Sequence, residues 1–504
     1  MNQNFFAAVA AAIGCDAEQV LLETDDGKLY TRGDILRESA RLAGLLCDAG
    51  AVRGDRIAVQ VDKSPAALSL YLACLRAGLV YLPLNIAYQR AELAYFLQDA
   101  RPRVVVCRPE SSPLLGELSA GRAEVFTLDH QGRGSLTDAA ASLPHEFKTA
   151  DCATDDLAVI IYTSGTTGRS KGAMVTHRNL LSNARALVDY WGFSDRDVLL
   201  HALPVFHIHG LFVANHCALL SGAKLLWHRK FDPVLVLRDL ARATVMMGVP
   251  TFYTRLLAHP GFGRDACESV RLFISGSAPL QLETFKEFKE RSGHSILERY
   301  GMSEAGMICS NPLHGERRAG SVGLPLPGVS VRIAQDYDIP VAPGAVGGIQ
   351  IKGENVFAGY WENPDKTRLE FTDDGYFRTG DLGAFDSDGY LSIVGRAKDL
   401  IISGGYNVYP KEIEIALDAL PGVMESAVFG IPHADFGEAV AAVLVPKQGV
   451  LLDTTAMIVE LRKNLANYKV PKQILLVEEL PRNAMGKVQK ALLRERYAKQ
   501  ITAG

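Results

Sequence analysis

The chain has 504 residues, 48% of them hydrophobic, so it is too long for a single hydrophobic core and should form at least two units. Its formal net charge of −4 comes from interspersed acidic and basic residues, which excludes the basic surface of a nucleic-acid-binding protein. The eight cysteines include no Cys-x-x-Cys pair. We therefore expect buried, reduced thiols, and neither disulfides nor a zinc site.

The N-terminal apolar run covers residues 5–13. It has no basic leader and is followed by Asp16 and Glu18, which predicts an amphipathic helix and not a signal peptide. No apolar stretch has the length that a membrane span requires. These features predict a cytoplasmic protein with no nucleic-acid partner and no membrane span.

Short β-branched runs alternate with helical patterns over the first two thirds of the chain. Strands are expected at 56–61, 103–107, 157–161, 224–227, 245–249 and 272–274, and a helix at 66–77. This alternation is typical of an α/β domain in which helices cover parallel sheets. From about residue 320 to 396, frequent Gly and Pro with short strands at 348–351 and 390–394 predict a β-rich subdomain.

The pattern changes again after Lys398. Helices are expected at 411–420 and 456–466 and strands at 427–430 and 439–445, which is enough for a small α+β domain. The predicted organisation is an N-terminal domain over residues 1–396, which includes the β-rich subdomain, and a C-terminal domain over 397–504.

A loop rich in glycine and hydroxyl groups, YTSGTTGRSKG at residues 162–172, directly follows the predicted strand at 157–161. Its glycines permit tight bends that bring backbone N–H groups to an anion, and Lys171 adds a cation. The spacing does not fit a Walker A loop, because the lysine is followed by Gly172 and not by Ser or Thr. We interpret the loop as a nucleotide-phosphate site of another type.

Five further motifs follow in order: ISGSAP at 274–279, ERYGMSE at 298–304, YFRTGDLG at 376–383, GRAKDLIISGG at 395–405 and PRNAMGK at 481–487. Together with the phosphate loop, they resemble the core motifs of the acyl-adenylate-forming enzymes, which include acyl-CoA synthetases, luciferases and peptide-synthetase adenylation domains. The segments HALPVFHIHGL at 201–211, GVPTFYTRL at 248–256 and GGYNVYP at 404–410 resemble most closely those of the malonyl-CoA synthetases.

The resemblance implies a reaction in which a carboxylate is joined to the α-phosphate of ATP, pyrophosphate leaves, and the thiol of CoA then attacks the adenylate. Fixed donors, a cation and Mg²⁺ would stabilise the charge that grows on the leaving group. By resemblance Glu304 coordinates Mg²⁺, Ser303 reaches the α-phosphate, Tyr300 stacks on adenine, and Asp381 and Arg396 bind the ribose. The other implied nucleotide-site residues are Thr163, Ser164, Gly165, Thr166, Thr167, Gly168, Lys171, Gly276, Ser277, Ala278, Glu298, Arg299, Gly301 and Met302.

Lys487 is implied as the catalytic lysine of adenylate formation, where it would bridge the substrate carboxylate and the α-phosphate. It is also expected to be a target of a lysine acetyltransferase and deacetylase, since acetylation would remove the cation. Because the two half-reactions require different faces of the C-terminal domain, that domain is expected to be mobile, with a hinge at Lys398. Gly405 would then leave space for the pantetheine arm of CoA.

The acid itself is predicted from a small group of residues. Pro250 fits the first turn of a helix, which places Arg255 on the second turn among apolar residues. By resemblance Arg255 binds the distal carboxylate of malonate, Ser275 and Met302 line the same short pocket, and His207 lies between the acid and the nucleotide. Malonate is the expected substrate, with methylmalonate as a second candidate.

Several alternatives stay open. The enzyme could activate another short aliphatic or aromatic acid, in which case Arg255 would be structural or part of a surface ion pair. A stand-alone adenylation domain for amino acids would need an acidic residue to bind the substrate amine, and residues 203–211 contain none. A catalytically inactive ATP-binding scaffold would be expected to lack Lys171, Glu304 or Lys487, and all three are present.

Overall fold

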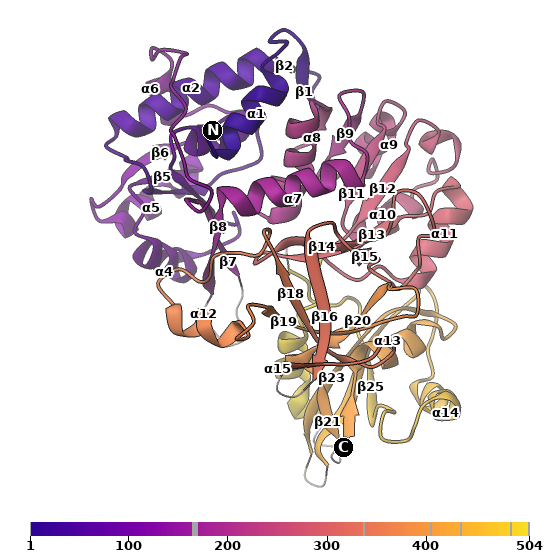
Figure 1. Ribbon diagram of the computed structural model, residues 1–504. Helices are drawn as coiled ribbons and strands as arrows, with labels where there is room; N and C mark the ends of the chain where they lie inside the picture. The colour runs from indigo at the N-terminus through magenta and orange to yellow at the C-terminus, as the bar shows by residue number, and fades with distance from the viewer. Residues whose placement is uncertain are drawn as a thin grey trace. The chain divides into compact units, whose positions relative to one another are not determined.

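The computed structural model describes residues 2–163, 170–335, 338–403, 406–433, 436–483 and 486–501, with the side chains of 498–501 left out. Contacts divide the chain into two compact units (Figure 1). Unit 1 comprises Met1–Ser330 and Lys352–Gly375, and unit 2 comprises Val331–Ile351 and Tyr376–Gly504. Each unit is described by itself.

The first sheet of unit 1 has six strands in the order β6-β5-β3-β4-β7-β8. Neighbouring strands from β6 to β7 are parallel, and β8 is antiparallel to β7. The strands are β3 (Arg56–Gln60), β4 (Val80–Pro83), β5 (Val104–Cys107), β6 (Glu124–Thr127), β7 (Leu157–Thr163) and β8 (Lys171–Thr176). The β7–β8 hairpin therefore carries the predicted phosphate loop at its tip.

The second sheet of unit 1 has nine strands in the order β15-β14-β13-β12-β11-β9-β10-β1-β2. The six strands from β13 to β1 are parallel to their neighbours, and antiparallel strands close both edges. The strands are β1 (Val20–Thr24), β2 (Leu29–Thr31), β9 (Val198–His201), β10 (Lys224–Trp227), β11 (Val245–Gly248), β12 (Leu272–Ser275), β13 (Leu297–Met302), β14 (Gly306–Ser310) and β15 (Leu324–Pro325).

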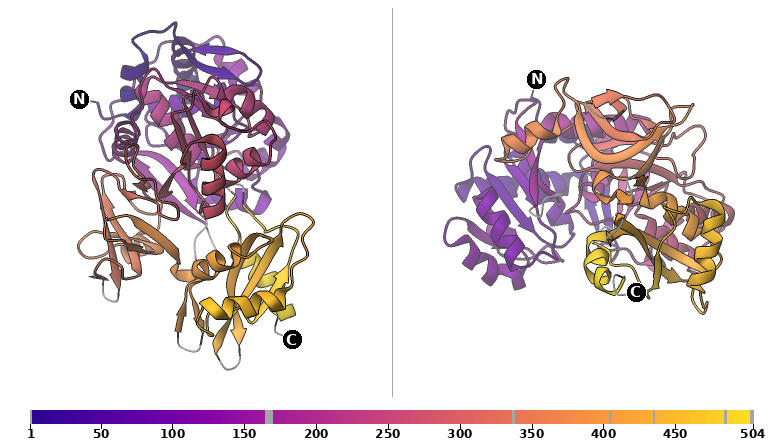
Figure 2. Two further views of the ribbon diagram at one scale, coloured as in Figure 1. Left: turned by 90° about the vertical axis from the view of Figure 1, so that its right-hand side faces the viewer. Right: turned by 90° about the horizontal axis from the view of Figure 1, so that it is seen from below.

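Helices connect the parallel strands and pack on the two sheets (Figures 1 and 2). They are α1 (Phe5–Ile13), α2 (Arg32–Asp48), α3 (Pro65–Arg76), α4 (Arg90–Ala100), α5 (Ser112–Ser119), α6 (Ser135–Ala140), α7 (His177–Tyr190), α8 (Asn215–Ser221), α9 (Pro233–Leu240), α10 (Pro250–Leu257), α11 (Leu282–Ser292) and α12 (Pro364–Glu370). Helix α7 begins directly after β8 with a capping box formed by Thr176 and Asn179, which fixes where the phosphate hairpin ends.

Unit 2 contains two antiparallel sheets. The first, in the order β17-β16-β18-β19-β20, is formed by β16 (Val329–Gln335), β17 (Ile339–Pro340), β18 (Gly347–Gly353), β19 (Phe377–Phe385) and β20 (Leu391–Arg396). The second, in the order β22-β21-β24-β23 with β25 parallel to β24, is formed by β21 (Ile401–Ser403), β22 (Tyr406–Val408), β23 (Val423–His433), β24 (Gly437–Pro446) and β25 (Gln473–Leu476). Helices α13 (Pro410–Asp418), α14 (Thr454–Asn464) and α15 (Lys490–Ile501) accompany the second sheet.

The predicted class is confirmed: parallel sheets covered by helices are followed by a β-rich region and a smaller α+β region. The expected domain boundary at residues 396 and 397 stays a prediction, and the structure has a 3₁₀ turn there, Ala397–Asp399. The thiol prediction needs a correction, because Cys15 is exposed and Cys47 is half-buried, whereas the other six cysteines are buried. Among the described residues, none of the helices is long and apolar enough to cross a membrane.

Candidate active site

The two strand ends that flank the phosphate loop lie opposite each other. Thr163 ends β7 and is paired in register with Lys171, the first residue of β8. Helix α4 holds both ends, since Tyr95 Oη donates to Ser170 O at 2.8 Å and Tyr162 Oη donates to Asp99 Oδ2. The sequence-predicted residues Ser164, Gly165, Thr166, Thr167 and Gly168 lie outside the described residues.

Glu304 lies next to this hairpin and is largely buried. Its Oε1 accepts hydrogen bonds from two hydroxyl groups, Thr163 Oγ1 and Tyr360 Oη, each at 3.2 Å. The ammonium group of Lys171 lies over the ring of Tyr360, 5.0 Å from its centroid. Burial, followed by the nearby charge of Lys366, lowers the pKa of Lys171. A carboxylate, a cation and two hydroxyl groups thus gather at the mouth of the phosphate loop.

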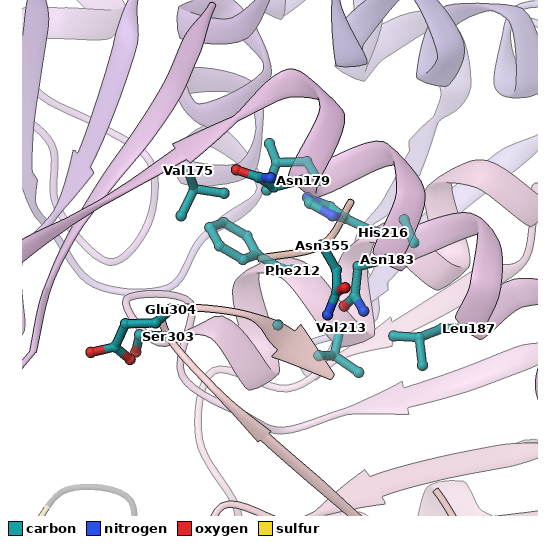
Figure 3. Close-up of a pocket in the computed structure, with 13 residues that line it drawn as sticks. Val175, Asn179, Asn183, Leu187, Phe212, Val213, His216, Ser303, Glu304 and Asn355 are labelled. Carbon is teal, nitrogen blue, oxygen red and sulfur yellow. The ribbon is translucent and has the colours of Figure 1, made fainter. Parts of the chain in front are cut away.

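Three asparagines fix the chain just after Glu304 and the neighbouring segment at residues 354–356 (Figure 3). Asn183 on α7 bonds both the N–H and the carbonyl of Met307, at 3.0 and 2.9 Å. Asn355 donates to Ala305 O at 2.7 Å, and Asn179 donates to the carbonyls of residues 354 and 356 at 2.8 Å each. Because the peptide N–H of Phe357 also donates to Glu304 O at 2.7 Å, the backbone of this carboxylate is held from two segments.

The residues predicted to surround the adenine lie in the loop after β12 and on β13. Gly276, Ser277 and Ala278 follow β12 directly, and β12 is parallel to β13, which carries Glu298 and the mostly buried Tyr300. Glu298 Oε1 accepts the peptide N–H of Leu280 at 3.0 Å, which ties the far end of the loop to β13. Ser277 adopts φ = 73°, a strained value for a side chain other than glycine, and such strain is characteristic of functional loops.

Arg299 on β13 is a charged residue in a buried position. Its side chain is 3% exposed, and its Nε and Nη2 have no hydrogen-bond partner among the described residues. A Cβ atom on Gly276 would lie 2.5 Å from the guanidinium carbon, so only glycine permits this approach. Burial lowers the pKa of Arg299 to about 9, which leaves it positively charged at neutral pH.

Two more polar groups of unit 1 are unsatisfied among the described residues, and one of them, His209, lies within electrostatic reach of Arg299. Ser275 Oγ and His209 Nε2 are buried and have no partner within the described ranges. His209 Nδ1 lies 3.2 Å from Ser277 Oγ, and its peptide N–H donates to Nδ1 of the half-buried His207 at 3.3 Å. Burial, with the charge of Arg299 adding to it, lowers the pKa of His209 well below its usual value, so this imidazole is neutral.

Buried unpaired donors around a buried cation are costly unless a ligand satisfies them. An anionic ligand would satisfy the donors of Arg299 that have no partner among the described residues.

The structure places Arg255 differently from this buried cluster. It lies on α10, which begins at Pro250 as predicted, but its side chain is exposed. Arg255 forms no hydrogen bond or ion pair with any described residue, so a surface ion pair does not account for it. Gly301, Met302 and Ser303, at the end of β13 and just beyond, are all half-buried.

Unit 2 brings three of the predicted residues together. Asp381 on β19 and Arg396 on β20 are cross-strand neighbours whose Oδ1 and Nε lie 3.2 Å apart. The half-buried Lys487 follows a turn in which Asn483 Oδ1 accepts its peptide N–H at 3.0 Å. Burial, followed by the charge of Arg396, lowers the pKa of Lys487 to about 8. Lys398 is exposed in the 3₁₀ turn, and Gly405 lies outside the described residues.

The donor set of unit 1 fits a magnesium ion that is shared with a substrate. Mg²⁺ is usually bound through one or two carboxylates together with substrate phosphates and water, and not by an all-protein cage. Glu304 supplies one such carboxylate at the phosphate loop. Over the described residues, no group of three or more His, Cys, Asp or Glu side chains is placed to hold a metal ion.

The sequence reasoning missed several residues of this site. Tyr360 and the three asparagines were not predicted, and Arg299 was assigned only to the nucleotide. Asn179 and Asn183 offered a signal, because two amides spaced i, i+4 on the buried face of an amphipathic helix require partners. Tyr360 offered none, since its partners lie far from it in sequence.

The fold and the site define an enzyme that handles a nucleotide and an acid: a phosphate hairpin, a carboxylate and a buried cation lie in unit 1, and a second cation lies in unit 2. Comparison with known families matches residues 8–361 to the AMP-binding enzyme family and residues 412–487 to the AMP-binding enzyme C-terminal domain. The chain belongs to this adenylate-forming family.

Three relatives illustrate the range of the family. The chain is 38% identical to a feruloyl-CoA synthase of Amycolatopsis over 94% of both chains. It is 36% identical to a mitochondrial malonate–CoA ligase of Bos taurus, over 93% of this chain and 87% of the relative. The crystal structure of ATP-bound MatB from Rhodopseudomonas palustris superimposes with a TM-score of 0.97 at 51% identity, over 99% of this chain and 100% of the other.

Proposed function

We propose that the protein is an AMP-forming malonate–CoA ligase. It would convert malonate and ATP to malonyl-AMP and pyrophosphate and then transfer the malonyl group to CoA. The similarity to the bovine malonate–CoA ligase and to MatB supports this assignment.

The observation that carries the choice of acid is the buried guanidinium of Arg299. A monocarboxylic acid uses its only carboxylate in the reaction and leaves an apolar tail in the acyl pocket, so the Nε and Nη2 donors of Arg299 would stay unsatisfied, although Glu298 offsets part of its charge. The second carboxylate of malonate would satisfy its free N–H groups, and Arg–carboxylate bonds are strong and directional. Ser275 and the exposed, unpaired Arg255 would complete an anionic subsite in this proposal.

Each side chain then has a role in adenylate formation. Glu304 would hold the magnesium ion, which when bound neutralises phosphate charge. Thr163, Lys171 and the loop residues 164–168 would bind the phosphates, with Ser303 at the α-phosphate. Nucleotide contacts would come from the β12–β13 region with Tyr300, and ribose contacts from Asp381 and Arg396.

Lys487 would bring the reacting carboxylate and the α-phosphate together. Burial destabilises the charged form of Lys487 and lowers its pKa to about 8. Two bound anions would therefore stabilise its ammonium group strongly. His207 would lie between the acid and the nucleotide. Gly405, which has no side chain, would leave space for the pantetheine arm of CoA. The hinge at Lys398 and the mobility of the C-terminal domain stay part of the proposal.

A screen of acids tests the function. AMP release would be measured with and without CoA for malonate, methylmalonate, sulfoacetate, butyrate, benzoate and ferulate. Malonate should give the highest kcat/KM, and CoA should be required for rapid turnover. A preference for butyrate, benzoate or ferulate would contradict the proposal.

A second candidate is a CoA ligase for an aromatic acid, which the similarity to the feruloyl-CoA synthase favours. The same screen separates the two candidates. An aromatic acid offers no anion to Arg299, so the malonate proposal is preferred.

We also propose that Lys487 is regulated by reversible acetylation. A lysine with a pKa near 8 is partly neutral at physiological pH, and the neutral amine is the form that attacks acyl donors. Mass spectrometry of the peptide that contains Lys487, isolated from cells with and without the deacetylase, tests this. The cytoplasmic location stays a prediction.

A further inference from the structure

Tyr360 connects the two charged groups proposed for the triphosphate. It lies between β18 and α12 and is 6% exposed. Its hydroxyl group is 3.2 Å from Glu304 Oε1, and its ring centroid is 5.0 Å from Lys171 Nζ. One side chain thus contacts both the carboxylate and the cation at the mouth of the phosphate loop.

The backbone around Tyr360 is fixed from two sides. Its peptide N–H donates to Thr367 Oγ1 at 2.9 Å, and it forms an isolated β-bridge with Ala173 on β8. Its ring also packs edge-on against Phe357, with the centroids 4.9 Å apart. The ring is therefore held by contacts within the protein against the same strand that carries Lys171.

This arrangement restricts how Glu304 and Lys171 can point. Two hydroxyl donors on Oε1, from Thr163 and Tyr360, restrict the orientation of the carboxylate plane. An ammonium group over an aromatic face is attracted to the ring and is kept from other orientations.

We propose that Tyr360 is a positioning residue that orients Glu304 toward the magnesium ion and Lys171 toward the phosphates of ATP. This inference rests on the proposed adenylation function. Residues that orient metal ligands by hydrogen bonding typically contribute about 10- to 100-fold in metal affinity. The two contacts of Tyr360 predict two separable effects, one on magnesium and one on the nucleotide.

Calorimetric titration with α,β-methylene-ATP, which cannot be cleaved at the reacting bond, separates these effects without turnover. Tyr360→Phe keeps the ring and loses the hydroxyl group, so the gain in affinity produced by Mg²⁺ should fall by about 10-fold while affinity in EDTA is unchanged. Tyr360→Leu also loses the ring, so affinity in EDTA should fall as well. Tyr190→Phe is the matched control, since its hydroxyl is 3.4 Å from Ser310 O on β14 and it should behave as wild type.

A double-mutant cycle distinguishes positioning from a general structural role. Glu304→Gln removes the proposed magnesium ligand. In that background, adding Tyr360→Phe should not further reduce the gain in nucleotide affinity that Mg²⁺ produces. Three outcomes would overturn the proposal. The losses in the double mutant could be additive, Tyr360→Phe could lower nucleotide affinity equally in EDTA and in Mg²⁺, or its Mg²⁺-dependent gain in affinity could stay within twofold of wild type. Thermal melting precedes each titration, and Tyr360→Leu, which also lacks the hydroxyl group, tests the magnesium effect if the Phe variant is unfolded.

The titration needs neither an acid nor CoA. A failed malonate screen would therefore refute the proposed substrate and leave this inference standing. A failed titration would refute the positioning role of Tyr360 and leave the proposed substrate unaffected.

Discussion

Arg299 in unit 1 and Lys487 in unit 2 are both cations whose pKa values burial lowers, to about 9 and about 8. The structural elements that carry these two side chains differ. Arg299 projects from the middle of a sheet strand against the backbone of Gly276, whereas Lys487 follows a turn near the C-terminus and is close to the charges of Arg396 and Lys398.

The difference suggests a division of tasks. A cation on a strand is fixed and can select a substrate by shape, as recognition requires. A cation on a turn can leave the site after one step, as a two-step reaction requires. Burial destabilises the charged form of both, so each would gain from binding an anion.

The largest effect is expected when the turn cation is removed. Lys487→Ala should reduce malonate-dependent pyrophosphate–ATP exchange by about 1,000-fold or more, because the repulsion between the two reacting anions is no longer compensated. Conversion of supplied malonyl-AMP to the thioester should stay within a few fold of wild type. Lys463→Ala is the control, since that exposed lysine only pairs with Glu460. Equal loss of both half-reactions would contradict the division of tasks.

Replacing the strand cation should change selectivity and not the reaction. Arg299→Met keeps much of the volume and removes the buried charge, so the KM for malonate should rise by about 100-fold, as for a lost bidentate ion pair. The KM for ATP should change little, and the melting temperature should not fall, because an apolar side chain carries no desolvation cost. An unchanged malonate KM would remove Arg299 from the acyl subsite.

A smaller effect is expected at Arg255. This arginine is exposed and therefore solvent-screened, so Arg255→Ala should raise the KM for malonate by about 10-fold with little effect on ATP. Steady-state kinetics at low and high salt provide the measurement, and the difference from wild type should shrink in high salt. A variant with wild-type kinetics would show that Arg255 does not contact the acid.

The last and smallest expected effect is the pH dependence of adenylate formation, which tests the role of Lys487 without a mutation. Lys487 is active in its protonated form, so kcat/KM for adenylate formation should fall as pH rises through about 8, by roughly 10-fold between pH 7 and 9. The rate of thioester formation from supplied malonyl-AMP should not fall over the same range. A pyrophosphate-exchange profile that is flat to pH 9 would show that another group supplies the proton-dependent step.

The fold class and the order of the site motifs could be predicted from the sequence. The strand at 224–227 was placed within its observed bounds, and the strand before the phosphate loop ran only two residues longer than predicted, to Thr163. Such local patterns depend on residues that are close in the chain. Cys15 and Cys47 were mispredicted, since exposure depends on what packs over a residue.

The sequence by itself determined the family, because its short motifs occur together and in order, and it located the hairpin that carries Lys171. The roles of Lys171, Glu304 and Lys487 follow from the resemblance and stay predictions. Only the tertiary structure decided that Arg299 is a buried cation with free donors and that Arg255 is exposed. It also placed Tyr360 against Glu304 across 56 residues of chain and against a strand from another part of the unit. The physical reason is that burial and hydrogen-bond partners are properties of packing between distant segments, which local sequence patterns do not encode.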